Sequence, residues 1–268
     1  MPPSPTDAGL RFDTAREAVL EAGALALSYF NDLGSLAIEA KTNAQDVVSI
    51  ADREVEKLLR ARIADAFPDD GFLGEEFGLT EGASGFTWVV DPIDGTSPFL
   101  HGMTSWCISV ALMSGRKTLL GLIYAPCADE LFTAEKGAGA FLNGRPIRVE
   151  PLRDLRSGLL GVGANLRVPP RLISGFIHRL LESGGMFIRN GSGALALADV
   201  ACGRLAGYYE PHINAWDCMA GLCLIREAGG WTNDFAADDL LAGGPVIACA
   251  PRLRAELAAL IASAEPAA

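Results

Sequence analysis

The sequence predicts a mixed fold of the α+β kind, in which sheets and helices pack in layers, and three observations support this class. Two amphipathic helical patterns open the chain, short apolar segments separated by turn residues follow, and strand and helix patterns alternate beyond residue 150. Half of the 268 residues are apolar, which is enough to bury a sizeable core. We therefore expect a compact molecule built from helices and sheets together.

Two helices are expected at the start of the chain. Between residues 14 and 30, and again between residues 49 and 66, apolar residues recur at the spacing that places their side chains on one face of a helix. Pro68 ends the second pattern, because proline cannot continue a helix without losing a backbone hydrogen bond.

An antiparallel, meander-like region of short strands is expected next. The pattern predicts strands at residues 88–90, 106–113, 119–124 and 130–134, with Gly, Lys and Pro turns between them. Asn143-Gly144 is a dipeptide favoured in tight hairpins, because both positions need a positive φ.

Beyond this region, strand and helix patterns alternate. We expect strands at 159–162 and 186–189, and helices at 171–183, 194–202 and 215–228. The polar segment near residue 150 predicts a boundary between an N-terminal α+β unit (1–150) and a C-terminal α/β unit (151–268). Two glycine-containing segments, 136–140 and 161–163, lack the spacing of phosphate-binding or dinucleotide-binding loops, and we expect turns at both.

Composition narrows the classes of function. The formal charge of −11 and a pI near 4.8 leave no basic surface for nucleic acid as a default partner. The six cysteines are scattered and form none of the close pairs of a zinc or redox site, which favours reduced thiols and a cytoplasmic protein. The N-terminal residues lack the pattern of a secretory signal, and no apolar run is long enough to predict a membrane span.

The most informative segment is Trp-Val-Val-Asp-Pro-Ile-Asp-Gly-Thr, residues 88–96. A buried strand would bring Asp91 to its end, and Asp94 follows at a spacing that a turn can bring to the same side. Two close carboxylates repel each other unless a cation lies between them, and oxygen ligands favour a hard ion such as Mg²⁺. Zinc is disfavoured because the chain has only three histidines. A capped helix after an ordinary Asp turn is the alternative interpretation.

Gly95 and Thr96 follow these carboxylates at the predicted start of a helix. Backbone N–H groups at such a glycine turn attract an anion, which indicates a phosphate site. Pro98 would lie in the first helical turn, where its missing N–H costs nothing.

Two motifs of this sequence resemble the two signatures of the inositol monophosphatase family. The first is Asp91-Pro92-Ile93-Asp94-Gly95-Thr96, and the second is Trp216-Asp217 followed by Ala220-Gly221 and Glu227-Ala228-Gly229-Gly230. The other marked positions of the family are matched in order by Lys41, Asp46, Asp52, Gly74-Glu75-Glu76, Gly191-Ser192-Gly193 and Tyr209-Glu210. The resemblance covers residues 12 to 250. It implies a layered α-β-α-β-α sandwich of the inositol monophosphatase and sugar phosphatase type.

The resemblance also implies a set of metal ligands. Glu75, Asp91 and the Ile93 carbonyl would hold one Mg²⁺, Asp91, Asp94 and Asp217 would hold a second, and a third ion would bind near Glu75. The N-terminal unit would therefore carry most of the ligands, and the C-terminal unit would supply Asp217 and substrate contacts. Metal pairs of this kind polarise a phosphoryl group and activate water.

Other residues receive roles by the same resemblance. The Thr96 hydroxyl, oriented by Asp52, would position the attacking water, and Glu75 would act with them in catalysis. The N–H groups of Gly95 and Thr96 would bind phosphate oxygens. No covalent phosphoenzyme is required.

The implied substrate is inositol 1-phosphate, hydrolysed to inositol and phosphate. Ser192, Gly193, Glu210 and Asp217 would contact it, since a carboxylate such as Glu210 can accept hydrogen bonds from two vicinal hydroxyls. A histidinol phosphate phosphatase, a nucleotide or sugar bisphosphate phosphatase, and a regulatory binding protein that keeps the fold are the alternatives. The resemblance further implies a homodimer and inhibition by Li⁺.

The chain departs from the family pattern at two places. Ser97-Pro98-Phe99 replaces the common Thr-Asn-Phe after the first signature, and Ala206 stands where an acidic residue is common. Three charged residues also have simpler interpretations. Asp52 and Asp217 would each suit the start of a helix through the helix dipole alone, and Lys41 would suit a solvated surface.

Overall fold

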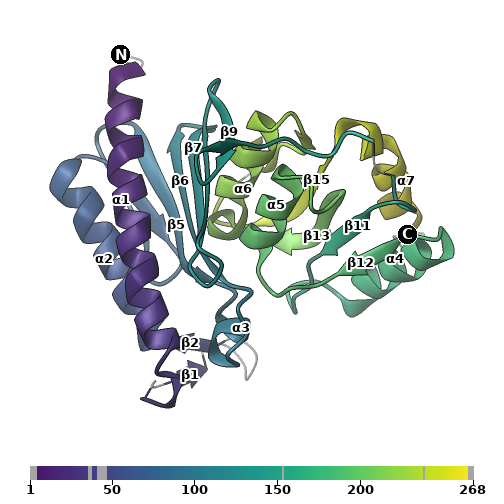
Figure 1. Ribbon diagram of the computed structural model, residues 1–268, viewed down its shortest axis with the longest axis horizontal. Helices are drawn as coiled ribbons and strands as arrows, with labels where there is room; N and C mark the ends of the chain where they lie inside the picture. The colour runs from purple at the N-terminus through teal and green to yellow at the C-terminus, as the bar shows by residue number, and fades with distance from the viewer. Residues whose placement is uncertain (1–4, 36–37, 41–46, 153, 238, 265–268) are drawn as a thin grey trace.

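The computed structural model describes residues 5–35, 38–40, 47–152, 154–237 and 239–264, which contain seven α-helices and two large sheets. Lys41 and Asp46 lie outside the described residues, so the two interpretations of Lys41 stay open. Helices and sheets alternate in five layers (Figure 1). The mixed, layered fold predicted from the sequence is confirmed.

The first layer consists of α1 (Pro5–Phe30) and α2 (Ile50–Ala66), which pack against one face of an eight-stranded sheet (Figure 1). The order of the strands in this sheet is β10-β9-β8-β7-β6-β5-β3-β4. All neighbours are antiparallel except β3 and β5. The strands are β3 (Gly71–Gly74), β4 (Gly78–Thr80), β5 (Phe86–Asp94), β6 (Cys107–Ser114), β7 (Lys117–Ala125), β8 (Glu130–Glu135), β9 (Gly139–Leu142) and β10 (Arg145–Pro146).

The middle layer, α5 (Gly193–Ala201) and α6 (Ala215–Glu227), lies between the two sheets (Figure 1). The second sheet has the order β12-β11-β13-β15-β14, in which β11 is parallel to both of its neighbours. Its strands are β11 (Leu159–Val162), β12 (Met186–Ile188), β13 (Gly207–Ile213), β14 (Trp231–Thr232) and β15 (Gly244–Cys249). The outer layer is α4 (Pro170–Glu182) and α7 (Arg254–Ala264).

Shorter elements join these layers. They are α3 (Thr96–Leu100), the 3₁₀ turns η1 (Leu33–Ser35), η2 (Phe235–Ala237) and η3 (Pro251–Leu253), and a separate two-stranded ribbon of β1 (Ile38–Ala40) and β2 (Val47–Ser49). The hairpin turn expected at Asn143-Gly144 lies between β9 and β10, and both residues have positive φ, 48° and 74°.

The alternation of side chains along β5 explains how the strand directs its acidic end. Trp88 and Val90 are buried against α1 and α2, whereas Val89 is buried on the opposite face, in the core that contains α5 and α6. Because alternate residues of a strand share a face, Asp91 lies on the side of Val89, toward α6. The layering therefore sets the direction of this carboxylate.

The structure differs from the sequence predictions at several elements. Gly161 and Val162 lie in β11 and not in a turn, whereas the turn expected at 136–140 is present before and at the start of β9. The first helix starts nine residues earlier than predicted, and β5 continues through Pro92 to Asp94. The proposed boundary near residue 150 stays a prediction. Among the described residues, no helix combines the length and the apolar character needed to cross a membrane.

Candidate active site

The end of β5 brings two carboxylates into one cavity. The pairing between β5 and β6 is irregular between Asp91 and Asp94, and Asp91 closes a short local turn by accepting a hydrogen bond from Ile93 N (2.9 Å). Gly95 follows with a φ of 96°, and a Cβ there would lie 2.9 Å from the carbonyl oxygen of Ser105. Only glycine fits this sharp exit into α3.

A third carboxylate comes from α6. Asp217 is the third residue of this helix and accepts a hydrogen bond from Asn214 N (3.1 Å), so it caps the start of its own helix. The Ser109 hydroxyl, on β6, donates to the Trp216 carbonyl (3.0 Å) and ties the start of α6 to the strand beside Asp91. Asp217 thereby faces the end of β5 while it caps its own helix.

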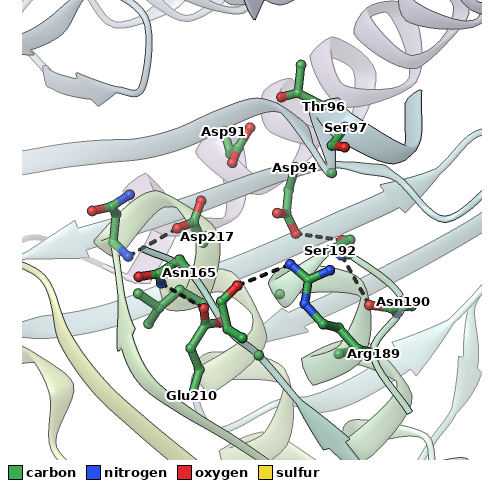
Figure 2. Close-up of a pocket in the computed structure, with 18 of the residues that line it drawn as sticks. Asp91, Asp94, Thr96, Ser97, Asn165, Arg189, Asn190, Ser192, Glu210 and Asp217 are labelled. Atoms are coloured by element: carbon green, nitrogen blue, oxygen red, sulfur yellow. Dashed lines mark hydrogen bonds between the residues drawn. The ribbon is translucent and has the colours of Figure 1, made fainter. Parts of the chain in front are cut away.

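Three acidic side chains form one cluster. Glu75, directly after β3, Asp91 and Asp217 each offer a carboxylate oxygen, and these atoms all lie within 4.8 Å of one another. The carboxylate of Asp94 lines the same cavity, and it accepts hydrogen bonds from Ser192 and Ala194. Figure 2 shows Asp91, Asp94 and Asp217 directed toward the same space.

Burial and mutual repulsion make these carboxylates weak acids. Burial, followed by the negative charges of Glu75, Asp94 and Asp217, raises the pKa of Asp91 well above its ordinary value. Burial and the charges of Asp94 and Glu75 raise the pKa of Asp217 in the same way. Burial raises the pKa of Asp94 to about 7, although two hydrogen bonds oppose the shift. A bound cation would therefore stabilise the ionised carboxylates of this cluster.

The two hydrogen bonds to Asp94 come from the start of α5. Asp94 Oδ2 accepts from the Ser192 hydroxyl (2.6 Å) and from Ala194 N (2.6 Å). Ser192 also caps α5, since its side chain accepts from Leu195 N (3.1 Å). The hydroxyl of Ser192, which the sequence placed among substrate contacts, is thus bonded to Asp94 and to its own helix.

Asp52 and Thr96 meet although 44 residues separate them in the chain. The Thr96 hydroxyl lies 3.2 Å from Asp52 Oδ1 and 3.2 Å from the Ile93 carbonyl oxygen, so it can donate to either. Asp52 is in the first turn of α2 and only 1% exposed. An acid interacts favourably with the start of a helix even when it is exposed, so the helix dipole does not explain the burial of Asp52. The contact with Thr96 gives the buried carboxylate a specific partner.

Glu210, on β13, lies at the other side of the cavity. Its Oε2 accepts from the Tyr208 hydroxyl (2.5 Å), and its Oε1 accepts from Asn165 Nδ2 (2.9 Å). Burial raises the pKa of Glu210, and the hydrogen bonds from Tyr208 and Asn165 oppose this. Gly163 packs so closely that a Cβ there would lie 2.1 Å from Glu210 Oε2, which explains why no larger residue fits. Glu210 is therefore held in one position.

Most of these groups line one cavity of about 220 Å³ between β5, α5, α6 and β13. The lining includes every residue that the sequence assigned to the site except Asp52, which reaches it through Thr96: Glu75, Asp91, Ile93, Asp94, Gly95, Thr96, Ser192, Gly193, Glu210 and Asp217. Sequence reasoning missed Asn165, Tyr208, Arg167 and Arg189, which line the cavity as well. These four lie outside the two signatures. Tyr208 could have been found from its place two residues before Glu210 on one strand, and the signal of the other three is only spatial.

The donor set of the cluster fits a hard divalent cation. Every candidate ligand is a carboxylate or carbonyl oxygen, and the described residues place no histidine in the cavity. Such a set suits Mg²⁺ in preference to zinc or copper. The raised pKa values of Asp91 and Asp217 indicate the same fit, because a bound cation would offset the repulsion that raises them.

Known proteins resemble this chain over most of its length. Residues 11–266 match the model of the inositol monophosphatase family. An inositol-1-monophosphatase from Rhizobium meliloti is 41% identical over 227 residues (81% of this chain, 83% of the relative), and a Nus factor SuhB from Xylella fastidiosa is 40% identical over 225 residues (83% and 81%). Among solved structures, the extragenic suppressor protein suhB from Bartonella henselae superposes with a TM-score of 0.87 at 34% identity, covering 93% of this chain and 97% of that one. An inositol monophosphatase from Anabaena gives a TM-score of 0.83 at 31% identity, with 97% and 98% covered.

Proposed function

Because this chain belongs to the inositol monophosphatase family, it is a phosphomonoesterase, and we propose that it hydrolyses inositol 1-phosphate to inositol and phosphate with Mg²⁺. The observation that carries the proposal is the convergence of Glu75, Asp91 and Asp217, whose carboxylate oxygens lie within 4.8 Å of one another in a cavity beside Thr96 and Glu210. A cluster of this charge is stable in its ionised form only with cations.

Glu75, Asp91, the Ile93 carbonyl, Asp94 and Asp217 would hold two or three Mg²⁺ ions. Mg²⁺ at this place would polarise the phosphoryl group, favour the ionisation of water and stabilise the leaving oxygen. Asp94 would be kept in position by Ser192 and Ala194, which leave its second oxygen to face the cavity.

The attacking water would be positioned by Thr96. When the Thr96 hydroxyl donates to Asp52, its oxygen keeps lone pairs that can accept a hydrogen bond from a water in the cavity that Thr96 lines. Asp52 thereby fixes the direction of the hydroxyl, and the pair acts as a proton relay. The N–H groups of Gly95 and Thr96 would contact phosphate oxygens, and the reaction would proceed without a phosphoenzyme.

Glu210 would bind the alcohol part of the substrate. Each of its oxygens accepts one hydrogen bond within the protein, and each has a second lone pair for a hydroxyl of a polyol. Gly193 would contact the substrate through its backbone, and a side chain there is disfavoured because a Cβ would lie 2.7 Å from Ile213 Cδ1. Because a carboxylate would also suit a cationic amine, histidinol phosphate is the competing substrate.

A second candidate function is regulatory binding by a protein that keeps this fold. The name Nus factor SuhB, given to the relative from Xylella fastidiosa, supports this candidate. We further propose a homodimer that is inhibited by Li⁺, as the family resemblance implies, and a cytoplasmic location, since all six cysteines are free.

Phosphate release from a panel of phosphomonoesters, measured with and without Mg²⁺, tests the proposal. We expect Mg²⁺-dependent turnover with inositol 1-phosphate as the preferred substrate. Glu210→Gln should raise KM for this substrate and lower kcat/KM by the equivalent of about 1 to 3 kcal/mol, and it should leave p-nitrophenyl phosphate turnover intact. A strong preference for histidinol phosphate would refute inositol 1-phosphate as the substrate. No phosphate release from any ester would favour regulatory binding as the function.

A further inference from the structure

Tyr208 approaches the candidate active site from the core between the two sheets. It lies two residues before Glu210 on β13, so both side chains are on the same face of the strand, toward the middle layer. Tyr209, between them, faces the outer layer, where its ring packs against Phe176 of α4 (4.5 Å between ring centroids). Tyr208 is only 3% exposed and yet lines the cavity. It therefore meets Glu210 from the protein interior and not from solvent.

Two glycines make room for the side chain of Tyr208. A Cβ on Gly161, in β11, would lie 2.8 Å from Tyr208 Cδ2, and a Cβ on Gly163, directly after β11, would overlap the Tyr208 hydroxyl oxygen. Glycine in or beside a strand often marks a place where another group approaches the backbone closely. The neighbouring strand thus leaves Tyr208 a position in which its hydroxyl lies beside Glu210.

Both oxygens of the Glu210 carboxylate accept a hydrogen bond from the protein. Oε2 accepts from the Tyr208 hydroxyl (2.5 Å), and Oε1 accepts from Asn165 Nδ2 (2.9 Å; Figure 2). Burial, followed by the negative charge of Glu210, raises the pKa of Tyr208 well above its ordinary value. The hydroxyl therefore stays protonated and remains a donor to Glu210.

Of the groups around Glu210, Tyr208 does most to keep its carboxylate ionised. Burial raises the pKa of Glu210, and among the groups that oppose this rise the Tyr208 hydroxyl acts most strongly. Asn165, Arg189 and Arg167 follow in that order. Without the hydroxyl, Oε2 would lose a donor inside the protein, which costs free energy. Glu210 would then turn toward another donor or take up a proton, and in either case it would offer fewer lone pairs to a ligand.

We propose that Tyr208 is a specificity-determining positioning residue, which holds Glu210 so that its carboxylate can accept hydroxyls of the alcohol part of the substrate. The inference rests on the proposed phosphatase function, and it names the residue that makes this site prefer a polyol to an alcohol without further hydroxyls. Tyr208 acts through Glu210, at the side of the cavity opposite the carboxylate cluster. Binding of the alcohol part should therefore depend on Tyr208, and the chemical step should not.

Tyr208→Phe tests the proposal, because it keeps the ring and removes only the hydroxyl. The values of kcat/KM for inositol 1-phosphate and for p-nitrophenyl phosphate are measured at saturating Mg²⁺, and their ratio reports the preference for the polyol. We expect this ratio to fall about tenfold, through a higher KM for inositol 1-phosphate with kcat nearly unchanged, since a hydrogen bond to a charged group is lost. Asn165→Ala removes the other donor to Glu210 and should lower the ratio in the same direction.

A second substitution separates positioning from a structural role. In a Glu210→Ala background, Tyr208→Phe should change the ratio no further, because the carboxylate through which Tyr208 acts is absent. Tyr124→Phe is the matched control: it removes a tyrosine hydroxyl that also donates to a carboxylate, that of Asp129 (3.1 Å), outside the lining of the cavity. It should leave the ratio unchanged.

Three results would overturn the proposal. They are an unchanged ratio in Tyr208→Phe, an equal loss on both esters, and a loss in the ratio that persists in the Glu210→Ala background. An equal loss would mean that Tyr208 serves the carboxylate cluster or the fold, and the melting temperature of the variant distinguishes these two.

Failure of the proposed function gives a different result. It would appear as no Mg²⁺-dependent phosphate release from either ester by wild type. Calorimetric binding of the two esters to wild type and to Tyr208→Phe then decides the inference by itself. Weaker binding of inositol 1-phosphate alone to the variant supports the role of Tyr208. Equal affinities of the two proteins for inositol 1-phosphate, or no binding to wild type, refute it.

Discussion

At the scale of single residues, Asp91 combines the deepest burial in the cluster with repulsion from three neighbouring carboxylates. It is 1% exposed, and the negative charges of Glu75, Asp94 and Asp217 all raise its pKa. Removing its charge therefore relieves repulsion in the protein without cations, but it also removes the carboxylate that would be shared between two ions.

We expect Asp91→Asn to abolish Mg²⁺-dependent turnover and to leave the free energy of unfolding of the metal-free protein equal or higher. Phosphate release and urea unfolding in the presence of EDTA measure the two effects. Normal activity would exclude Asp91 as a ligand, whereas a large loss of stability would show that the charge is compensated within the fold.

A separate prediction concerns Thr96 and Asp52. Their side chains lie 3.2 Å apart, as the family resemblance implied. Thr96→Ala and Asp52→Asn should each lower kcat by about two powers of ten, a typical scale for a group that positions a proton transfer. If they form one relay, the loss in the double variant should be close to that of either single variant. Losses that multiply would mean that the two residues act independently.

Sequence reasoning located these residues because their signal is local, and it missed others for the same reason. Asp91 and Asp94 stand in a short motif whose spacing itself indicates chemistry, and Asp217 was assigned through the family resemblance of its own short motif. Asn165 contacts Glu210 only because β11 and β13 are neighbours in the second sheet, whereas Tyr208 lies two residues before Glu210 on β13 itself. A lone asparagine after a strand carries no signal before the sheet order is known.

At the scale of secondary structure, apolar patterns predicted the long helix α2 and some short strands, and strands with glycine or proline were missed. The pattern for residues 49–66 anticipated α2, and that for residues 159–162 anticipated β11. β3 and β13 were missed: β3 has four residues, two of them glycine, and β13 contains Pro211. β5 includes Pro92 because its pairing with β6 is already interrupted there, so no ladder hydrogen bond is lost.

One contact between elements has a consequence for the candidate metal site. Glu56, on α2, is fully buried, and its carboxylate accepts hydrogen bonds from Glu76 N (2.7 Å) and Phe77 N (3.3 Å). Arg60 donates to the same carboxylate from one turn further along the helix (2.8 Å). A buried charge with three donors thus fixes the turn that begins at Glu75.

We expect Glu56→Gln to lower the free energy of unfolding by about 1 to 3 kcal/mol, because a buried charged acceptor is replaced by a group that leaves donors unsatisfied. It should also weaken Mg²⁺ binding measured by calorimetry, since the turn that carries Glu75 is no longer fixed. Glu21→Gln is the matched control: it removes an exposed carboxylate on α1 that pairs with Arg62 of α2, and a loss of about 0 to 1 kcal/mol is expected. Equal effects of the two variants would contradict this role of Glu56.

At the scale of the whole molecule, the five layers bring together residues from both halves of the chain. Glu75 and Asp91 come from the first sheet, and Asp217 comes from a helix packed between the two sheets. The sequence predicted layers of helices and sheets, and family resemblance supplied their order. Periodicity alone could not predict the order of the layers, because it identifies which face of an element is buried and not which element covers that face. The site therefore depends on the assembled core, and its charge should influence the stability of the entire fold.

This dependence predicts how stability changes with pH. Asp94 has a pKa of about 7 in the folded protein and near 4 in an unfolded chain, so between these values the folded state holds a proton that the unfolded state has lost. Raising the pH through this window favours the unfolded state. The raised pKa values of Asp91 and Asp217 act in the same direction. The melting temperature of the metal-free protein should therefore fall from pH 5 to pH 8.

Mg²⁺ should reverse this trend, because it binds the ionised carboxylates and only the folded protein brings them together. The increase in melting temperature on adding Mg²⁺ should grow between pH 5 and pH 8, and scanning calorimetry in EDTA and in Mg²⁺ measures it. Asp94→Asn removes one titrating group. In EDTA it should therefore reduce the slope of the free energy of unfolding against pH by at most about 1.4 kcal/mol per pH unit. An increase that stays constant with pH would show that Mg²⁺ does not bind at these carboxylates, whatever the activity of the protein.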